Sequence, residues 1–293
     1  MKGSTNRLCG RVKWLCSMAS SFVLTAALTV QGQIVTLTDK SAVAVVNLDS
    51  GASNALGMTS WTIAGINNLA QQWFWYRIGD SGAESPINAI GGLSFSQPDA
   101  RTLYATYDNG SYGVTIHYLL TGSAFGPGIS NVSSDISEGI SIVNHTANPL
   151  AFHFFQYSDF DLLGTPTGDT VQLGKNLRGL FNEADQTKSG GPITAALTET
   201  VVTPGANEGE AALFNTTLTK LSNSTTDDLN NDPGPATGDA TWALQWDLTI
   251  PGGGSVGITK DKYIQITNIP EPCLFAFFSL GSVGYLLRKR RSS

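Results

Sequence analysis

Short apolar runs separated by turn residues fill the region from residue 33 to residue 268, and this spacing constrains the fold more than any other feature. The runs are rich in β-branched and aromatic residues, and turn signals recur about every 8–12 residues. No long stretch has the 3.6-residue apolar period of an amphipathic helix. The pattern therefore predicts an all-β fold, an antiparallel β-sandwich or jelly-roll-like single domain.

The individual strands are predicted from the apolar runs, and one hairpin turn stands out. Asp108-Asn109-Gly110-Ser111 is a strong hairpin signal. Residues 66–72 fit either a helical turn or an extended segment, and the polar, Pro/Gly-rich residues 223–238 predict a long loop. The expected strands are 33–38, 42–48, 58–63, 73–78, 102–107, 112–120, 136–144, 150–157, 193–202, 211–221, 241–250, 255–259 and 263–267.

Charge is divided unevenly along the chain. Of its 17 basic and 23 acidic residues, residues 33–268 hold nine and 22, a net charge of −13 for this region. An acidic body argues against nucleic acid as a partner and against docking on anionic lipid. All three cysteines lie outside residues 33–268, so this region has no disulfide, thiolate metal site or cysteine nucleophile.

The first 32 residues have the organisation of a secretory signal peptide. A basic stretch up to Lys13 precedes an apolar run from about Met18 to Val30, and Val30-Gln31-Gly32 supplies small residues before Gln33. The apolar run is too short to span a membrane as a mature helix. A buried N-terminal helix is the alternative. The preferred reading predicts export through the secretion machinery and a mature region that begins near residue 33.

The last 25 residues, 269–293, combine three parts in a fixed order. Ile269 and the motif Pro270, Glu271 and Pro272 come first, and the two prolines keep this segment extended. An apolar run of about 15 residues follows, which predicts a short transmembrane helix. The basic cluster Arg288, Lys289, Arg290 and Arg291 comes third and favours the cytoplasmic side of the membrane, with the acidic body outside.

Residues 269–291 together resemble the PEP-CTERM sorting signal of Gram-negative bacteria, which is also labelled an ice-binding protein C-terminal domain. The resemblance implies recognition by an exosortase, a membrane-bound protease-transpeptidase, and an association with extracellular polysaccharide. It implies an exported protein, at least transiently membrane-anchored and then placed at the cell surface or in the matrix. A plain C-terminal membrane anchor is the alternative. Parts of the body, at residues 72–79, 155–161, 243–247 and 255–262, resemble an uncharacterised group of domains that carry this tail, and that group implies no catalytic residues.

One acidic loop suggests calcium. Asp228, Asn230 and Asp232 place oxygen atoms at alternate positions, and Asp239 is the twelfth residue counted from Asp228. Proline stands where the corresponding calcium loop has a glycine, so a turn-rich loop without an ion is the alternative. Calcium is the one cofactor that the sequence suggests.

Trp73, Trp75 and Arg77 share one face of an expected strand, which suggests carbohydrate binding by stacking on sugar rings. A buried core strand is the alternative. Asp159 and Asp161 also share a face, and paired carboxylates suit calcium or acid–base chemistry, although a solvated turn is the simpler interpretation.

The three histidines, His117, His145 and His153, have no metal-site spacing, and His153 is expected to pack in or beside the core. No catalytic residue is assigned. The sequence therefore predicts a non-enzymatic, structural or adhesive β-sandwich. A carbohydrate-binding module of the polysaccharide matrix is the first alternative, and a glycan-active enzyme that uses Asp159 or Asp161 is the second.

Overall fold

The computed structural model describes residues 33–49 and 56–268. The expected signal peptide, residues 1–32, lies outside the described residues. So does the expected sorting and anchor segment, residues 269–293, with its Pro270-Glu271-Pro272 motif and basic cluster. Among the described residues, no helix is both long and apolar enough to cross a membrane.

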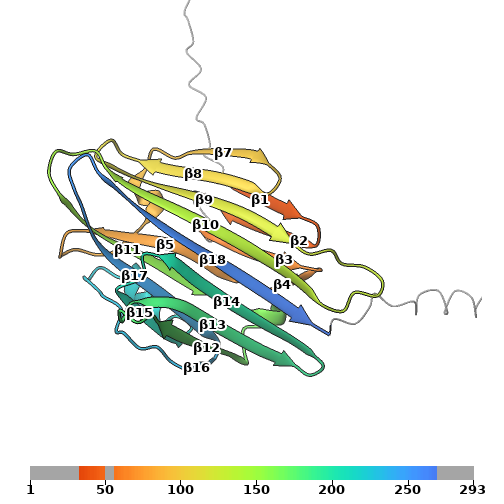
Figure 1. Cartoon of the computed structure of the whole chain (residues 1–293). Helices are drawn as coiled ribbons and strands as arrows, with labels where there is room; N and C mark the ends of the chain where they lie inside the picture. The colour runs from red at the N-terminus through yellow and green to blue at the C-terminus, as the bar shows by residue number, and fades with distance from the viewer. Residues whose placement is uncertain (1–32, 50–55, 269–293) are drawn as a thin grey trace, which may run out of the picture. The chain divides into compact units, whose positions relative to one another are not determined.

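Two nine-stranded sheets make up the described region (Figure 1). In sheet A the strand order is β1-β2-β3-β5-β11-β17-β15, with β4 beside β3 and β6 beside β5. All of its pairings are antiparallel, as the sequence pattern predicts. Its strands are β1 (Ile34–Asp39), β2 (Ala42–Asn47), β3 (Gly57–Ile63), β4 (Ile66–Asn67), β5 (Gln71–Ile78), β6 (Ser85–Pro86), β11 (Leu150–Asp159), β15 (Glu208–Leu213) and β17 (Ala240–Ile250).

Sheet B has the order β16-β12-β13-β14-β18-β10-β9-β8-β7 and is also antiparallel throughout. Residues 33–49 and 56–268 also contain three short helical segments: η1 (Ile87–Ile90), η2 (Leu162–Gly164) and α1 (Thr216–Ser222). The strands of sheet B are β7 (Ser94–Asp99), β8 (Thr102–Asp108), β9 (Tyr112–Gly122), β10 (Val132–Asn144), β12 (Asp169–Lys175), β13 (Phe181–Gly190), β14 (Ile193–Thr203), β16 (Ala236–Gly238) and β18 (Ser255–Thr267).

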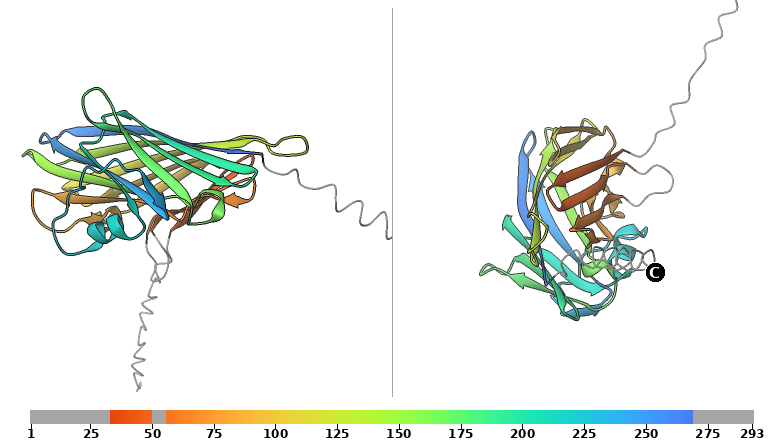
Figure 2. Two further views of the ribbon diagram at one scale, coloured as in Figure 1. Left: turned by 90° about the horizontal axis from the view of Figure 1, so that it is seen from below. Right: turned by 90° about the vertical axis from the view of Figure 1, so that its right-hand side faces the viewer.

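The two sheets pack face to face around a core of aliphatic and aromatic side chains (Figure 2). Buried and less buried residues alternate along β10, because successive side chains of a strand point to opposite faces. Hydrogen bonds also cross the core. Trp61 Nε1 on β3 donates to Ser134 Oγ on β10 at 3.0 Å, and Gln156 Nε2 on β11 donates to Glu199 Oε2 on β14 at 2.7 Å. The all-β sandwich is therefore confirmed.

Several details differ from the sequence-based expectation. The strands β7–β10 and β12–β14 follow one another as meanders in sheet B, whereas a jelly roll is built from Greek keys. For residues 66–72, which the sequence left open between a helical turn and an extended segment, the structure has strands: residues 66–67 form β4 and residues 71–72 begin β5. The expected strand 211–221 is divided, since β15 ends at Leu213 and α1 follows it. The expected strands 255–259 and 263–267 are one continuous strand, β18, because the polar residues between them face inward and are paired there.

Candidate functional site

Arg77, His153 and Asp247 occupy directly opposed positions on three neighbouring strands of sheet A. His153 on β11 is the register partner of Arg77 on β5 and of Asp247 on β17. Residues opposite one another in antiparallel strands project to the same face of the sheet. The backbone pairing therefore places a guanidinium, an imidazole and a carboxylate side by side.

This row of side chains lies on the face of sheet A that points away from sheet B. The neighbouring residues mark the inner face: Tyr76 stacks on Phe152 at a ring separation of 5.7 Å and contacts Tyr112 of sheet B at 5.8 Å. Arg77 and His153 alternate with these residues and so point outward. The outer face is covered in part by the segments before η1 and after α1.

His153 is held by a carboxylate through one ring nitrogen. Its Nδ1 lies 2.6 Å from Oδ1 of Asp247. Because an ionised carboxylate only accepts hydrogen bonds, this contact places a proton on Nδ1 and leaves the lone pair of the neutral ring on Nε2. Nε2 is buried without a hydrogen-bond partner, and the nearest carboxylate oxygen to it is Oδ1 of the exposed Asp80 at 3.7 Å.

Arg77 beside it is held from two sides. Its Nη1 donates to the buried Glu84 carboxylate and, at 2.7 Å, to the carbonyl oxygen of Asp227, while Nη2 donates to Oδ1 of Asp228 at 2.8 Å. Burial by itself would lower the pKa of Arg77, but the hydrogen bonds to Asp228 and Glu84 outweigh it and raise the pKa. The guanidinium thus stays charged, and its hydrogen bonds to Asp227 and Asp228 connect β5 to the segment after α1.

Gln245 connects the arginine to the histidine pair. Its Nε2 donates to Oδ1 of Asp228 and to Oδ1 of Asp247, each at 2.9 Å, and its Oε1 accepts from the backbone N–H of Leu229. Glu208, opposite Gln245 on β15, adds another carboxyl group. Burial, followed by repulsion from Asp228 and Asp247, raises the pKa of Glu208. The outer face therefore presents one connected polar network.

The chemistry that this network allows is proton transfer. A neutral imidazole with its lone pair on Nε2 is a general base, and the carboxylate on Nδ1 stabilises the imidazolium that forms when Nε2 takes a proton. We use the term His153 site for Arg77, His153, Asp228, Gln245 and Asp247.

The residues expected to bind sugar, Trp73, Trp75 and Arg77, do not form one exposed surface in the structure. Arg77 belongs to the His153 site, but it is only 3% exposed. Trp73 is fully buried and packs on Tyr107 of sheet B, and Trp75 is 5% exposed and packs on Tyr157. Because their ring faces are covered by protein, these tryptophans do not offer a stacking surface, and the buried-strand alternative holds.

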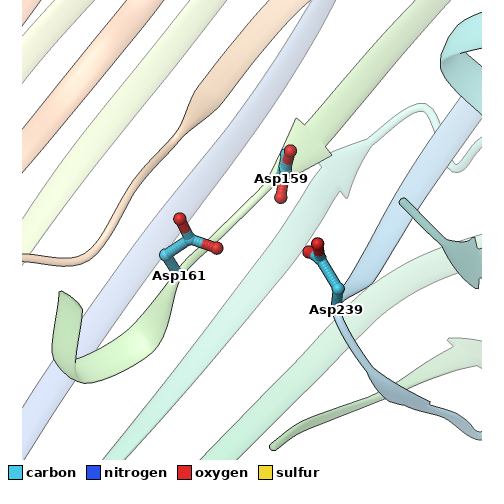
Figure 3. Close-up of side chains that lie close together, drawn as sticks. All are labelled: Asp159, Asp161 and Asp239. Carbon is cyan, nitrogen blue, oxygen red and sulfur yellow. The ribbon is translucent and has the colours of Figure 1, made fainter. Parts of the chain in front are cut away.

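The expected calcium loop is not assembled as one site. Asp228 is engaged by Arg77, and Asn230 Oδ1 accepts a hydrogen bond from the backbone N–H of Asp232 within a tight turn. Asp239 instead lies beside Asp159 and Asp161, with an oxygen of each carboxylate within 4.8 Å of the others (Figure 3). The sequence spacing predicted that Asp228, Asn230, Asp232 and Asp239 form one calcium loop. In the structure Asp239 lies between β16 and β17, away from the other three residues.

The catalytic potential of His153 was missed by the sequence analysis. Its position between Phe152 and Phe154 does indicate that it points away from the residues that pack in the core. Which residues would flank it depends on the pairing of β11 with β5 and β17, strands that lie more than 70 residues away along the chain. His145 is the comparison case, because its Nε2 pairs with Asp108 at 2.8 Å on the exposed surface. His117 stacks on Tyr104.

A surface groove of about 510 Å³ lies elsewhere, over β12, β13, β14 and β18. Lys188 is its one ionisable lining residue, and threonine, serine, glutamine, alanine and glycine form the rest. The Lys188 ammonium is already paired with the buried Asp169 at 3.0 Å, so this groove holds no ionisable group without a partner.

The comparisons with known proteins concern the fold. No protein-family model matches the sequence, and no curated protein matches it. Among solved structures, one from Escherichia coli K12, provisionally described as an aldose 1-epimerase, has a TM-score of 0.46 at 11% identity, with 82% of this chain and 100% of that chain covered. A galactose mutarotase-like protein from Lactobacillus casei has a TM-score of 0.41 at 9% identity over 80% of this chain and 99% of that chain. A bacterial glucoamylase complexed with acarbose has a TM-score of 0.44 at 7% identity over 82% of this chain and 34% of that chain.

These findings correct the expectation of a non-enzymatic, structural or adhesive sandwich. The expectation relied on the lack of a catalytic constellation in the sequence, whereas the folded chain brings an imidazole, a carboxylate and a guanidinium together in the His153 site. The expectation is therefore not retained.

Proposed function

We propose that this protein is a carbohydrate-active enzyme that transfers a proton to or from a sugar at the His153 site. The observation that carries the proposal is the contact of His153 Nδ1 with Asp247 at 2.6 Å, together with a buried Nε2 that has no hydrogen-bond partner. A general base oriented by a carboxylate is the arrangement that acid–base catalysis requires. The proposal follows the enzymatic alternative but moves it from Asp159 and Asp161 to His153.

The neighbouring groups suit a polyhydroxylated substrate. Asp80 and Asp247 place carboxylate oxygens 3.7 and 2.6 Å from the ring nitrogens of His153, and Asp228 lies on the neighbouring Arg77; carboxylate oxygens accept hydrogen bonds from hydroxyl groups. Arg77 sets the position of Asp228 and does not itself reach solvent. Asp80 Oδ1 lies 3.7 Å from Nε2 on a side chain that is 96% exposed, so a substrate hydroxyl can displace it without breaking buried contacts.

The test measures turnover of sugars by the purified full-length protein. Anomerisation of α-D-glucose and α-D-galactose is followed by polarimetry, and release of reducing ends is followed on soluble polysaccharides. His153→Asn is expected to lower kcat/KM on the active substrate by at least about 10²-fold, since positioned general bases contribute about 10²–10⁴-fold. The pH profile of the residual activity should no longer show the change in kcat/KM that comes from ionisation of a histidine.

His145→Asn is the matched control, because it removes an imidazole that also pairs with an aspartate but lies on the open surface. It should leave the activity unchanged. Equal activity of His153→Asn and the unsubstituted protein would exclude the His153 site. Absence of turnover on every sugar and polysaccharide tested would reject the enzymatic function.

We further propose that the protein is exported and sorted by an exosortase through Pro270-Glu271-Pro272, with the membrane and extracellular polysaccharide as its surroundings. The support is the order of motif, apolar run and basic cluster in the sequence. The test follows Glu271→Ala in cells that contain an exosortase. Loss of tail processing is expected, and processing identical to that of the natural sequence would contradict the assignment.

A further inference from the structure

Three aspartates from separate segments converge at the end of β11 distant from His153. Asp159 is the last residue of β11, Asp161 directly precedes η2, and Asp239 lies between β16 and β17. One carboxylate oxygen from each lies within 4.8 Å of the other two, and Figure 3 shows the three side chains turned toward a common region. We call this group the Asp159 cluster.

The positive charge needed to balance this cluster is not supplied by the described part of the chain. There, no lysine, arginine or histidine forms a salt bridge with any of the three. Lys188, whose charge acts on Asp161 and Asp239, is instead paired with Asp169 at 3.0 Å. Asp169 is a further carboxylate, itself buried, and adds to the negative potential around the cluster. Several like charges thus share a partly desolvated volume.

Asp159 provides an independent indication that a ligand is needed. Its side chain is more than nine-tenths buried, and its Oδ1 has no hydrogen-bond partner. Buried polar atoms are nearly always satisfied, so an unpaired oxygen on a carboxylate that lies beside two other carboxylates indicates a missing positive group. Burial, then repulsion from Asp161 and Asp239, raises the pKa of Asp159 to about 7. The pKa values of Asp161 and Asp239 are raised as well, with burial as the first cause.

We propose that Asp159, Asp161 and Asp239 bind one Ca²⁺ ion. Calcium takes 6–8 oxygen ligands at about 2.3–2.6 Å, so two oxygens that share the ion are at most about 5.2 Å apart. The cluster meets this limit without rearrangement. Its three carboxylates supply up to six oxygens, and water completes the shell.

Calcium is favoured over magnesium by geometry. Magnesium requires near-octahedral oxygens at about 2.0–2.1 Å, so two of its ligands are at most about 4.2 Å apart. Carboxylates on separate backbone segments, with Asp159 fixed in β11 by its pairing with β5 and β17, suit the flexible oxygen shell of calcium better than the strict octahedron of magnesium.

The position of the cluster indicates what the ion does. β11 and β17 belong to sheet A, whereas β16 belongs to sheet B. Asp239 is the residue at which the chain passes from one sheet to the other. An ion shared by Asp159 and Asp239 would therefore link the two sheets at this end of the sandwich and stabilise the folded state by binding it alone.

The test is calcium binding by the full-length protein after removal of metals with a chelator. Calorimetric titration with CaCl₂ is expected to give one site, and calcium is expected to raise Tm. Asp239→Asn and Asp161→Asn each remove a ligand charge at a partly exposed position and should weaken calcium binding at least 10-fold. Without calcium, each should raise Tm, because the substitution relieves carboxylate repulsion.

Asp185→Asn is the control, because Asp185 is an exposed aspartate whose carboxylate accepts a hydrogen bond from Thr198 at 2.6 Å. It should bind calcium as the natural sequence does. Three results would overturn the proposal: no calcium binding by the folded protein, unchanged binding in Asp239→Asn and Asp161→Asn, or equal affinity for Mg²⁺. The titration contains no sugar, so its outcome is independent of the proposed enzymatic function.

Discussion

Lys262 Nζ lies 2.7 Å from Oε1 of Glu138, and neither side chain has any exposed surface. Lys260 and Glu199 complete a fully buried group of two lysines and two glutamates on β10, β14 and β18. The ammonium of Lys260 also lies 5.2 Å from the centre of the Phe74 ring of sheet A, so the group sits between the sheets. Burial lowers the pKa of both lysines and raises that of Glu199.

Removing one charge of this group should be strongly destabilising. Glu138→Gln leaves both lysines with one remaining carboxylate, and breaking a buried ion pair on one side costs about 3–5 kcal/mol. Urea unfolding should show this loss in the free energy of unfolding. The double variant Glu138→Leu with Lys260→Met removes one charge of each sign and should lose less than Glu138→Gln. A loss below about 1 kcal/mol for Glu138→Gln would contradict the electrostatic explanation.

Arg77 should stabilise the fold through Glu84. Arg77→Met leaves the buried Glu84 carboxylate without its partner, for an expected loss of about 3–5 kcal/mol in the free energy of unfolding. Adding Glu84→Gln to Arg77→Met should recover part of that loss, because the unpaired charge is then gone. If the double variant is as unstable as the sum of the two single variants, the two residues are not coupled.

Asp135 should make stability depend on pH. Burial, then repulsion from Asp261, raises its pKa from 3.8 to about 6. Between these values the folded protein binds more protons than the unfolded chain, so this contribution to stability falls as pH rises from about 4 to about 6. Thermal unfolding across this range should show a smaller downward slope in Asp135→Asn. An identical slope in both proteins would show that Asp135 titrates normally.

Gly57 should be intolerant of any side chain. Its φ is +87°, and an added Cβ would lie 2.3 Å from the carbonyl oxygen of Gln72 and 2.6 Å from Cε3 of Trp73. Gly57→Ala therefore combines backbone strain of about 1–2 kcal/mol with an overpacking cost of about 1–3 kcal/mol. Gly65→Ala is the control, since Gly65 has a φ of +83° with nothing within 4 Å. Chemical denaturation should give about 1–2 kcal/mol for Gly65→Ala and a clearly larger loss for Gly57→Ala.

The fold class followed from local pattern alone. Period-two alternation and turn residues are properties of neighbouring positions, and they were sufficient to predict an antiparallel sandwich and most of its strands. The strands β12 and β13 were missed because their inward positions include polar residues such as Gln186 and Lys188. Their burial becomes favourable only when partners such as Asp169 and the carbonyl of Phe160 are in place.

The candidate sites depended on long-range pairing, and the sequence by itself could not determine them. Asp159 and Asp161 were recognisable as a carboxylate pair, but Asp239 reaches them only because β17 pairs with β11. His153 was recognisable only as a histidine between two phenylalanines, and Asp247 reaches it through the same pairing. The alternation of side chains along a strand depends only on neighbouring residues, so the sequence by itself predicts it. Strand order and register depend on the packing of the whole sandwich, so only the tertiary structure determines them.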